Sequence, residues 1–457
     1  MKFVSEPVRE HGDAPLGDAG RLEELVERWL SKGERPTTED GRNRCFVASI
    51  GEWEIEESRR AQLAEILSLV DAQGDPVVGS HSYRHRRPNP KTLIGRGVYE
   101  DIAQKAREVN ASMVVVDVEL SPSQTRNLEE AISLPVCDRE AVILNVFLRN
   151  ARTRKARIQV EIAQLEFLRP RIRGVGLSMD QQAGGVLGSR GPGETASELF
   201  SRKIDGRLNE LRRAFVRLER AGQVQRRSRD GCARIALVGY TNAGKTTLMN
   251  ALANAELSAK NRPFETLDTT SRTLSRYGVD VILSDTVGFI RRLPERLLAS
   301  FESTLAEARE ASLLAIVINI ADSEWRLHLD TTERVLDKLD LGETERFYVF
   351  NKADLLRAVD VRREVELAAG KHSYRVVSGQ NQEDVDELRE ALLLSVRAHE
   401  KEATVFVPYS RGEISSAIYR TTRVVRSECS PDGTEYTIAG KPHFVDAIVA
   451  MSEGRQS

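Results

Sequence analysis

The chain has 457 residues, a length that suits about three domains, and its 40% content of hydrophobic residues suffices for packed cores. A formal net charge of −2 excludes a uniformly basic nucleic-acid binder, although the basic residues are unevenly spread. No apolar run of roughly eighteen residues is present to cross a membrane, and the first residues lack the apolar segment of a signal peptide, so we expect a cytoplasmic protein. Four cysteines without a CxxC pair indicate neither a disulfide framework nor a zinc site.

Residues 1–44 form a charged N-terminal extension, in which one amphipathic helix is expected from about residue 19 to 30. Residues 45–137 then alternate short apolar runs with helical patterns, which predicts an α/β domain with a largely parallel sheet. The expected strands cover residues 45–50, 77–79 and 113–117, and the expected helices cover residues 58–70, 98–109 and 123–132.

Two stretches of this domain contain residues capable of binding chemistry. The segment His81–Lys91 mixes cations, imidazoles and Tyr83, which suits contacts to RNA phosphates and bases and equally suits a solvated basic loop. Asp117, Glu119 and the turn Gly95–Gly97 would suit a second nucleotide site. No phosphate loop of the P-loop kind precedes a helix there, so we interpret these residues as structural.

Residues 138–230 predict a long antiparallel helical hairpin. One helix is expected from Asp138 to Arg169, since neither Gly nor Pro interrupts the pattern before Pro170. A second helix is expected from Ala196 to about Gly222, where apolar residues recur at spacings of four and three, the pattern of a coiled-coil seam. A Gly-rich loop over residues 174–195 would join the two helices.

The predicted hairpin has an excess of basic residues. A run of one charge is usually a solvated face, but this excess in a chain of net charge −2 favours a footprint for an RNA backbone. Because glycine costs much conformational entropy to order, the loop is either a spacer or a segment that a partner orders; no strand precedes it, so we expect no nucleotide site there. The candidate contacts are Arg152, Arg154, Lys155, Arg190, Gly191 and Gly193.

The stretch after this hairpin predicts a phosphate-binding P-loop, the start of a GTPase-like domain over residues 231–400. An apolar strand, Ile235–Val238, leads into a glycine-bounded loop and a helix-forming run without a break. Lys245 would reach the β- and γ-phosphates, and the hydroxyl of Thr246 would bind Mg²⁺. The candidate nucleotide contacts are Gly239, Tyr240, Thr241, Asn242, Ala243, Gly244, Lys245, Thr246 and Thr247.

Three further motifs each follow an apolar strand. An acid after a strand beside the P-loop strand can hold Mg²⁺ through water, and a following glycine N–H can meet the γ-phosphate. Asp354 can accept two hydrogen bonds from guanine, whereas adenine offers no such pair of donors, so the base is expected to be guanine. The motif residues are Asp285, Thr286, Val287 and Gly288; Asn351, Lys352, Ala353 and Asp354; and Ser378, Gly379 and Gln380.

A mobile threonine that binds Mg²⁺ only beside a γ-phosphate is expected between the P-loop helix and Asp285. Thr266, Thr269 and Thr270 all satisfy this chemistry, and the residues alone leave the three open. The candidate nucleotide contacts of this segment are Phe264, Glu265, Thr266, Leu267 and Asp268.

Together these residues resemble the HflX family of ribosome-associated GTPases. The resemblance rests on Phe264–Asp268, on Asp285–Ile290 and on Gly191–Thr195 outside the GTPase domain, and it extends from about residue 45 to at least 395. It implies that Thr266 is the switch threonine and binds Mg²⁺ with Thr246, and that the hairpin tip enters the large ribosomal subunit near its catalytic centre. The sequence departs from the family pattern at Thr269, at Ala196-Ser197 and at Ser378-Gly379-Gln380.

Two residues bear on the hydrolysis rate. Phe289 follows Gly288 at a place where many GTPases use a glutamine to orient water, so slow intrinsic hydrolysis is expected until a partner supplies a group or reshapes this segment. Asn242 suits either a K⁺ ion beside the phosphates or a plain hydrogen bond within the loop, and both interpretations stay open.

Residues 401–457 predict a small α+β domain with a strand at 404–408, a helix at 413–420 and a hairpin across Ser430–Gly433. The whole chain is therefore predicted to be a multidomain α/β protein. We expect a monomeric GTPase that binds GTP and GDP with Mg²⁺, contacts the large ribosomal subunit and its rRNA, and couples hydrolysis to splitting or rescue of stalled ribosomes. The alternative is a GTP-gated RNA-binding factor in large-subunit assembly.

Overall fold

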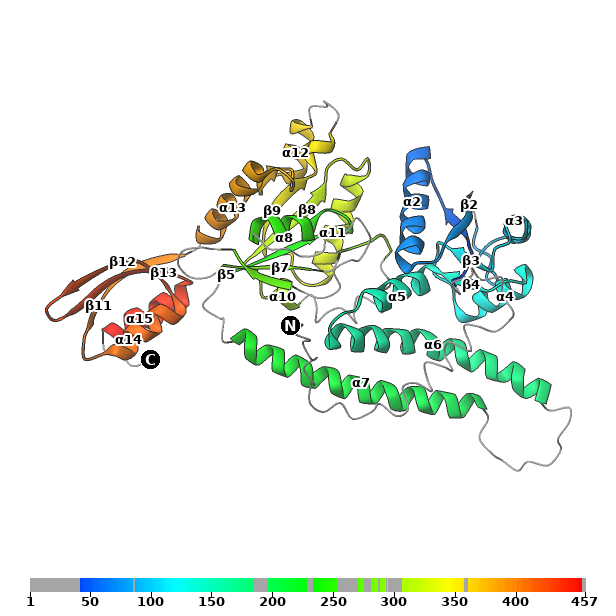
Figure 1. Ribbon diagram of the computed structural model, residues 1–457, viewed down its shortest axis with the longest axis horizontal. Coiled ribbons are helices and arrows are strands. Elements are labelled where there is room, and N and C mark those ends of the chain that lie inside the picture. Colours follow the sequence, from blue (N-terminus) through cyan, green and yellow to red (C-terminus); the bar gives the residue numbers. More distant parts are fainter. Residues whose placement is uncertain are drawn as a thin grey trace, which may run out of the picture.

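The computed structural model describes residues 42–84, 87–183, 196–227, 233–253, 270–274, 281–286, 288–292, 294, 306–356, 361–398 and 400–453. Figure 1 shows an N-terminal sheet and a central sheet side by side, a helical hairpin running along both, and a small sheet at the far end of the chain. The multidomain α/β fold predicted from the sequence is thus confirmed. None of the described helices is long and apolar enough to span a membrane.

The N-terminal sheet has four parallel strands in the order β2-β1-β3-β4. These strands are β1 (Cys45–Gly51), β2 (Val77–Arg84), β3 (Met113–Val116) and β4 (Val136–Asp138), and their helices are α2 (Glu56–Gln73), α3 (Arg96–Glu108), α4 (Pro122–Ile132) and α5 (Arg139–Asn150). Apolar residues of α2 and α5 pack on one face of the sheet, and those of α3 and α4 pack on the other. Ser121 caps α4 as a capping box with Gln124, beside Pro122 at the first turn.

Strand β2 is longer than the sequence suggested. It continues to Arg84, so the first four residues of the predicted basic loop His81–Lys91 belong to an edge strand of the sheet. The ring of Tyr83 is buried and its hydroxyl donates to Asp101 at 2.8 Å. Tyr83 is therefore part of the core and does not offer a free face for stacking on a base.

The helix expected over residues 138–169 is wrong in its bounds. The helical conformation is interrupted at Ala151–Thr153, so α5 ends at Asn150 and α6 (Arg154–Ala183) is a separate helix. Helix α6 also continues through Pro170 and through Gly174 and Gly176, which the sequence assigned to a loop. Within the turn at Pro170, the guanidinium of Arg171 donates to the carbonyl of Phe167 at 3.2 Å.

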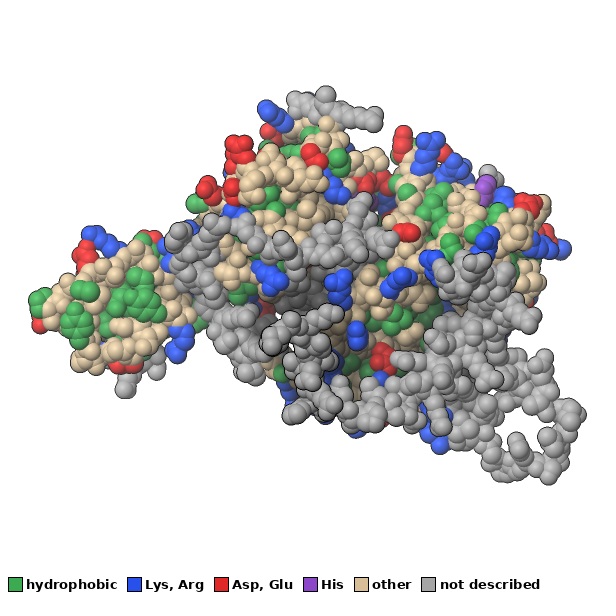
Figure 2. Space-filling model, viewed as in Figure 1, with side chains coloured by type: hydrophobic (Ala, Val, Ile, Leu, Met, Phe, Trp, Pro, Cys, Tyr) green, Lys and Arg blue, Asp and Glu red, His purple; other side chains and the backbone are tan. Residues whose placement is uncertain are grey.

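Helix α6 and α7 (Ala196–Arg227) form the predicted antiparallel hairpin. Their seam consists of Ile158, Leu165, Ile204, Leu208 and Leu211. Several arginines of the hairpin form ion pairs between its two helices: Arg207 with Glu161 at 2.8 Å, Arg169 with Asp205 at 2.9 Å and Arg212 with Glu166 at 2.7 Å. Exposed Arg213, Arg217 and Arg220 remain on α7, and Figure 2 shows basic side chains along this edge of the molecule.

The central sheet has six strands in the order β10-β9-β8-β5-β7-β6, and only β6 runs antiparallel. The strands are β5 (Ala233–Gly239), β6 (Thr270–Thr273), β7 (Val281–Asp285), β8 (Leu313–Asn319), β9 (Glu345–Asn351) and β10 (Ser373–Val376). The helices are α8 (Lys245–Ala253), α10 (Ala306–Arg309), α11 (Trp325–Lys338), α12 (Arg362–Ala369) and α13 (Gln382–Arg397), with the 3₁₀ turn η1 (Ala353–Leu355). Because the strands are nearly all parallel and buried, the loops at their carboxyl ends meet along one edge.

The last unit is a three-stranded antiparallel sheet in the order β11-β13-β12, with two helices packed on one face. Its elements are β11 (Lys401–Pro408), α14 (Gly412–Thr421), β12 (Arg423–Ser430), β13 (Gly433–Gly440) and α15 (Pro442–Ser452). The predicted turn across Ser430–Gly433 joins β12 and β13.

The buried ion pair between Arg171 and Asp138 joins α6 to the N-terminal sheet, at 2.7 Å. Burial raises the pKa of the Asp138 carboxyl, and Arg171 opposes that shift. We predict that Arg171→Met leaves Asp138 buried without its cation and lowers the free energy of unfolding by about 3–5 kcal/mol. Urea unfolding measures this change, and the exposed Arg213→Met on α7 is the matched control, with a change within about 0.5 kcal/mol. Equal stability of the two variants would contradict the prediction.

Candidate nucleotide-binding site

The loop between β5 and α8 has a backbone that only glycine accommodates at two positions. Gly239 has φ +150°, and a Cβ there would lie 2.3 Å from the carbonyl oxygen of Val317. Gly244 has φ +93°, and a Cβ there would lie 2.3 Å from Nδ2 of Asn351. At both positions a side chain would clash with neighbouring atoms, and the positive φ angle also favours glycine. Such a backbone lets the loop present its N–H groups to phosphate.

Lys245 is the first residue of α8, and its ammonium group points back over the loop. Nζ donates to the carbonyls of Gly239 at 3.0 Å and Tyr240 at 2.9 Å. Burial lowers the pKa of Lys245 to about 8, and the nearby Asp285 partly opposes the shift. The loop thus holds a poorly solvated cation at the helix N-terminus, which suits an incoming phosphate.

Thr246 and Asp285 bring together two oxygen atoms that can bind a metal ion. The Thr246 hydroxyl donates to Oδ2 of Asp285 at 2.7 Å, and Asp285 lies fully buried at the end of β7. Hydroxyl and carboxylate oxygens of this kind fit Mg²⁺. Thr266, the third residue of the expected magnesium site, lies outside the described residues, as do Phe264, Glu265, Leu267, Asp268 and Val287.

The loops after β9 and β10 are hydrogen-bonded to the P-loop and to each other. Asn351 donates from Nδ2 to the carbonyl of Ala243 at 2.9 Å and accepts at Oδ1 from the N–H of Gly379 at 3.0 Å. The Ser378 hydroxyl donates to Oδ1 of Asp354 at 2.7 Å, which fixes the carboxylate that the sequence assigned to the base. The structure therefore brings the residues of three motifs, far apart in sequence, to one edge of the central sheet.

Asn242 lies beside this cluster. Its φ is 61°, and its Oδ1 accepts from Nζ of Lys352 at 3.4 Å. Burial lowers the pKa of Lys352. This contact joins the P-loop to the motif after β9 and is not the hydrogen bond within the loop that the sequence left open beside K⁺ binding. Both interpretations stay predictions.

The segment after Asp285 lies directly on the P-loop. Phe289 donates from its N–H to the carbonyl of Gly239 at 3.0 Å, and its carbonyl accepts from the N–H of Thr241 at 2.7 Å, as one parallel bridge. Its side chain is 2% exposed and belongs to the core under the central sheet. The next residue, Ile290, belongs instead to the core shared by α2, α5 and α6. The consecutive side chains of Phe289 and Ile290 therefore pack into two different cores.

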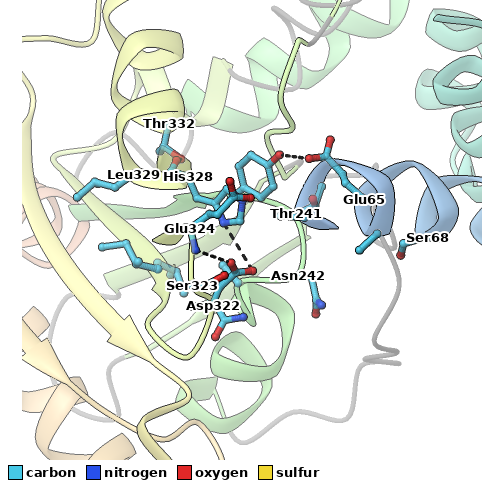
Figure 3. A pocket seen from close by; sticks show the side chains of 17 residues that line it. Glu65, Ser68, Thr241, Asn242, Asp322, Ser323, Glu324, His328, Leu329 and Thr332 are labelled. Carbon is cyan, nitrogen blue, oxygen red and sulfur yellow. Dashed lines mark hydrogen bonds and ion pairs between the residues drawn. The ribbon is translucent and has the colours of Figure 1, made fainter. Parts of the chain in front are cut away.

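A pocket of about 410 Å³ lies between this loop and α2 of the N-terminal unit, and Figure 3 shows polar side chains from α2, the P-loop and α11 around it. The ring of Tyr240 stacks on His328 with centroids 3.9 Å apart, and its hydroxyl donates to Glu65 at 2.8 Å. Burial and Glu65 raise the pKa of Tyr240 well above its ordinary value, while burial lowers the pKa of His328. Sequence analysis missed Glu65 and His328, because 175 residues separate Glu65 from Tyr240 and no motif marks either.

The predicted RNA contacts lie elsewhere. Arg152 and Arg154 are exposed at the break between α5 and α6, and Lys155 is half-buried with its ammonium 5.6 Å from the ring centre of Phe215. Arg190, Gly191 and Gly193 fall outside the described residues. Asp117, by contrast, is fully buried and bonded to Arg139 at 2.6 Å and Gln62 at 2.8 Å, which agrees with the structural role assigned from the sequence.

Comparison with known proteins matches three family models. GTP-binding GTPase N-terminal covers residues 60–148, GTP-binding GTPase Middle Region covers residues 150–229, and 50S ribosome-binding GTPase covers residues 234–352. The GTPase HflX of Flavobacterium psychrophilum is 39% identical over 316 residues, which are 69% of this chain and 76% of the relative. The GTPase HflX of Escherichia coli is 34% identical over 375 residues, which are 81% and 88%.

A weaker likeness is found to the solved GTP-binding protein of Sulfolobus solfataricus with GDP, at 21% identity and a TM-score of 0.42, over 77% of this chain and 98% of that one. The P-loop and the matching GTPase model define the protein as a P-loop GTPase, an enzyme that binds guanine nucleotide and hydrolyses GTP. The relatives cover more than two thirds of the chain at more than 30% identity, so the chain belongs to the GTPase HflX family.

The carboxylate of Asp354 generates a prediction for base recognition. In Asp354→Asn one acceptor oxygen becomes an amino group that opposes the exocyclic amino group of guanine but can donate to the carbonyl of xanthine. Loss of a charge-assisted hydrogen bond costs about 1.5–3 kcal/mol, so GDP affinity should fall about 10- to 100-fold while XDP affinity rises. Competition of GDP, XDP and ADP against a fluorescent nucleotide measures this. Unchanged GDP affinity would show that Asp354 does not contact the base.

Proposed function

We propose that the protein is a switch on the large ribosomal subunit, whose GTP-bound state separates or rescues stalled ribosomes and whose hydrolysis releases it. The observation that carries the proposal is Phe289, which is 2% exposed in the core at the position where a water-orienting side chain would otherwise stand. A GTPase in this arrangement needs a partner to reach a high turnover rate. The matching family model, 50S ribosome-binding GTPase, supports the ribosome as that partner.

The nucleotide would lie along the edge where the P-loop, Asp354 and Ser378 meet. Asp354, oriented by Ser378, would accept the two donors of guanine, and Asn351 would keep the base-binding loop attached to the P-loop. Lys245 would bind phosphate oxygens in place of the carbonyls of Gly239 and Tyr240, and its charge would stabilise the negative charge that develops on the leaving diphosphate.

Thr246 and Asp285 would hold Mg²⁺, with Thr266 joining them, and the ion would neutralise phosphate charge as the bond to the γ-phosphate breaks. Once the segment that contains Gly288 has moved back from Lys245, Gly288 would present its N–H to the γ-phosphate. Since Phe289 cannot orient the attacking water, the partner would supply that group or move the segment that contains Phe289.

The hairpin is the proposed contact to rRNA. Arg152 and Arg154 are exposed at its start, and Arg213, Arg217 and Arg220 are exposed along α7. These arginines suit phosphate oxygens of a folded RNA, and their number on one element fits a backbone footprint better than sequence-specific readout. The second candidate function, a GTP-gated RNA-binding factor in subunit assembly, uses the same hairpin and the same Phe289.

GTP turnover in K⁺ buffer, with the protein alone and with added large ribosomal subunits, tests the proposal. We expect slow turnover alone and stimulation of at least tenfold by the subunits, because the partner completes the hydrolytic site. Lys245→Ala should abolish both rates, whereas Arg152→Glu with Arg154→Glu should weaken the stimulation while GDP affinity is retained.

Turnover that is fast without subunits and unchanged by them would contradict the proposal. A second assay distinguishes the two candidate functions. It follows the dissociation of intact ribosomes by light scattering. A splitting factor lowers the scattering with GTP or a non-hydrolysable analogue, and an assembly factor leaves intact ribosomes unchanged.

A further inference from the structure

The backbone of Arg291, two residues after Phe289, is held at both of its polar groups. Its N–H donates to the hydroxyl of Tyr240 at 2.8 Å, and its carbonyl accepts from the guanidinium of Arg139 at 2.8 Å. Tyr240 belongs to the P-loop, whereas Arg139 begins α5 of the N-terminal unit. Hydrogen bonds from two domains therefore hold the segment after Gly288 at a single residue, Arg291.

Glu65 on α2 links these two contacts. It accepts from the hydroxyl of Tyr240, forms an ion pair with Arg139, and lies 3.7 Å from Nε of Arg291. Arg139 is 2% exposed and Glu65 is 13% exposed, so solvent screens these charges little. We name Glu65, Arg139, Tyr240 and Arg291 the interdomain clamp.

The interdomain clamp is supported from behind. Asp117, itself hydrogen-bonded to Gln62, pairs with Arg139 at 2.6 Å and fixes the guanidinium in the N-terminal unit. On the other side Glu324 forms an ion pair with Arg291. Ile290, between Phe289 and Arg291, packs into the core of the N-terminal unit. The segment cannot leave the P-loop without breaking these contacts or moving α2 with it.

The held segment lies close to the ammonium group of Lys245, with no room for a side chain at Gly288. A Cβ on Gly288 would lie 2.9 Å from Nζ of Lys245 and 2.9 Å from Cα of Thr241. A γ-phosphate needs hydrogen-bond distance from that same ammonium group, so Gly288 must move back before the phosphate can enter. GDP has no γ-phosphate and leaves Gly288 in place.

We propose that α2 of the N-terminal unit sets the preference of the site between GDP and GTP, with Glu65 and Arg139 as positioning residues that hold Gly288 over Lys245 through Tyr240 and Arg291. In this state GDP binds freely, and GTP binds only at the cost of opening the interdomain clamp. A change that weakens the clamp raises GTP affinity and leaves GDP affinity as it was. This nucleotide preference requires no ribosome and is separate from the proposed cellular role.

The test compares equilibrium affinities of the full chain for GDP and for a non-hydrolysable GTP analogue. Glu65→Gln removes the charge that Tyr240, Arg139 and Arg291 share, and the ratio of GTP-analogue to GDP affinity should rise about tenfold, roughly what loss of one charge-assisted hydrogen bond supplies. Glu56→Gln is the matched control, since it makes the same substitution on the same helix at an exposed pair with Arg59, and it should leave the ratio unchanged.

A second variant separates positioning from folding. Tyr240→Phe removes the hydroxyl at the centre of the interdomain clamp, and if both variants release the same contact, Glu65→Gln with Tyr240→Phe should change the ratio no more than Glu65→Gln alone. An unchanged ratio in Glu65→Gln would overturn the proposal, whether or not its melting temperature falls. Equal changes in both affinities would also overturn it, because a merely structural role alters the two nucleotides alike.

Discussion

The constraint on which this structure depends is the backbone bridge between Phe289 and the P-loop. Two hydrogen bonds, from Phe289 N–H to Gly239 and from Thr241 N–H to Phe289, pin the segment after Asp285 across the loop that must receive phosphate. The bridge also decides where the next side chains go: Phe289 enters the core of the central sheet and Ile290 enters the core of the N-terminal unit. One short segment therefore connects the chemistry at Lys245 to the position of α2 and its sheet.

This connection gives the N-terminal unit a physical means of acting on the nucleotide. Arg139 and Glu65 are largely buried and Asp117 behind them is fully buried, so salt screens the ion pairs among them little. This buried cluster of the N-terminal unit contacts the central unit through Tyr240 and Arg291. A partner that displaces α2 would free Arg291 and, through it, Gly288. The basic hairpin continues from the same unit through α5 and α6, and a contact of the hairpin with RNA would reach the clamp through packed helices.

Local patterns predicted much of this molecule. The order of strand, Gly-rich loop and helix around Lys245 depends on neighbouring residues only, and the structure shows the backbone that the glycines imply. The predicted bounds of α5 and α6 were wrong because periodicity does not record tertiary contacts. Arg171, which follows Pro170, is bonded to Asp138 and Leu120 and anchors this part of α6 to the N-terminal sheet. Glu65 could not be found from the sequence, since its partners Arg139 and Tyr240 lie 74 and 175 residues away and spacing does not record such a contact.

Amide hydrogen exchange at Thr241, Phe289 and Arg291 shows whether the γ-phosphate releases the segment after Gly288, because these three N–H groups make the bonds that hold the segment on the P-loop. Exchange is measured with GDP and with a non-hydrolysable GTP analogue. We predict strong protection at all three amides with GDP, and exchange at Phe289 and Arg291 at least tenfold faster with the GTP analogue as Gly288 moves away from the γ-phosphate. Equal protection of these amides with both nucleotides would contradict it.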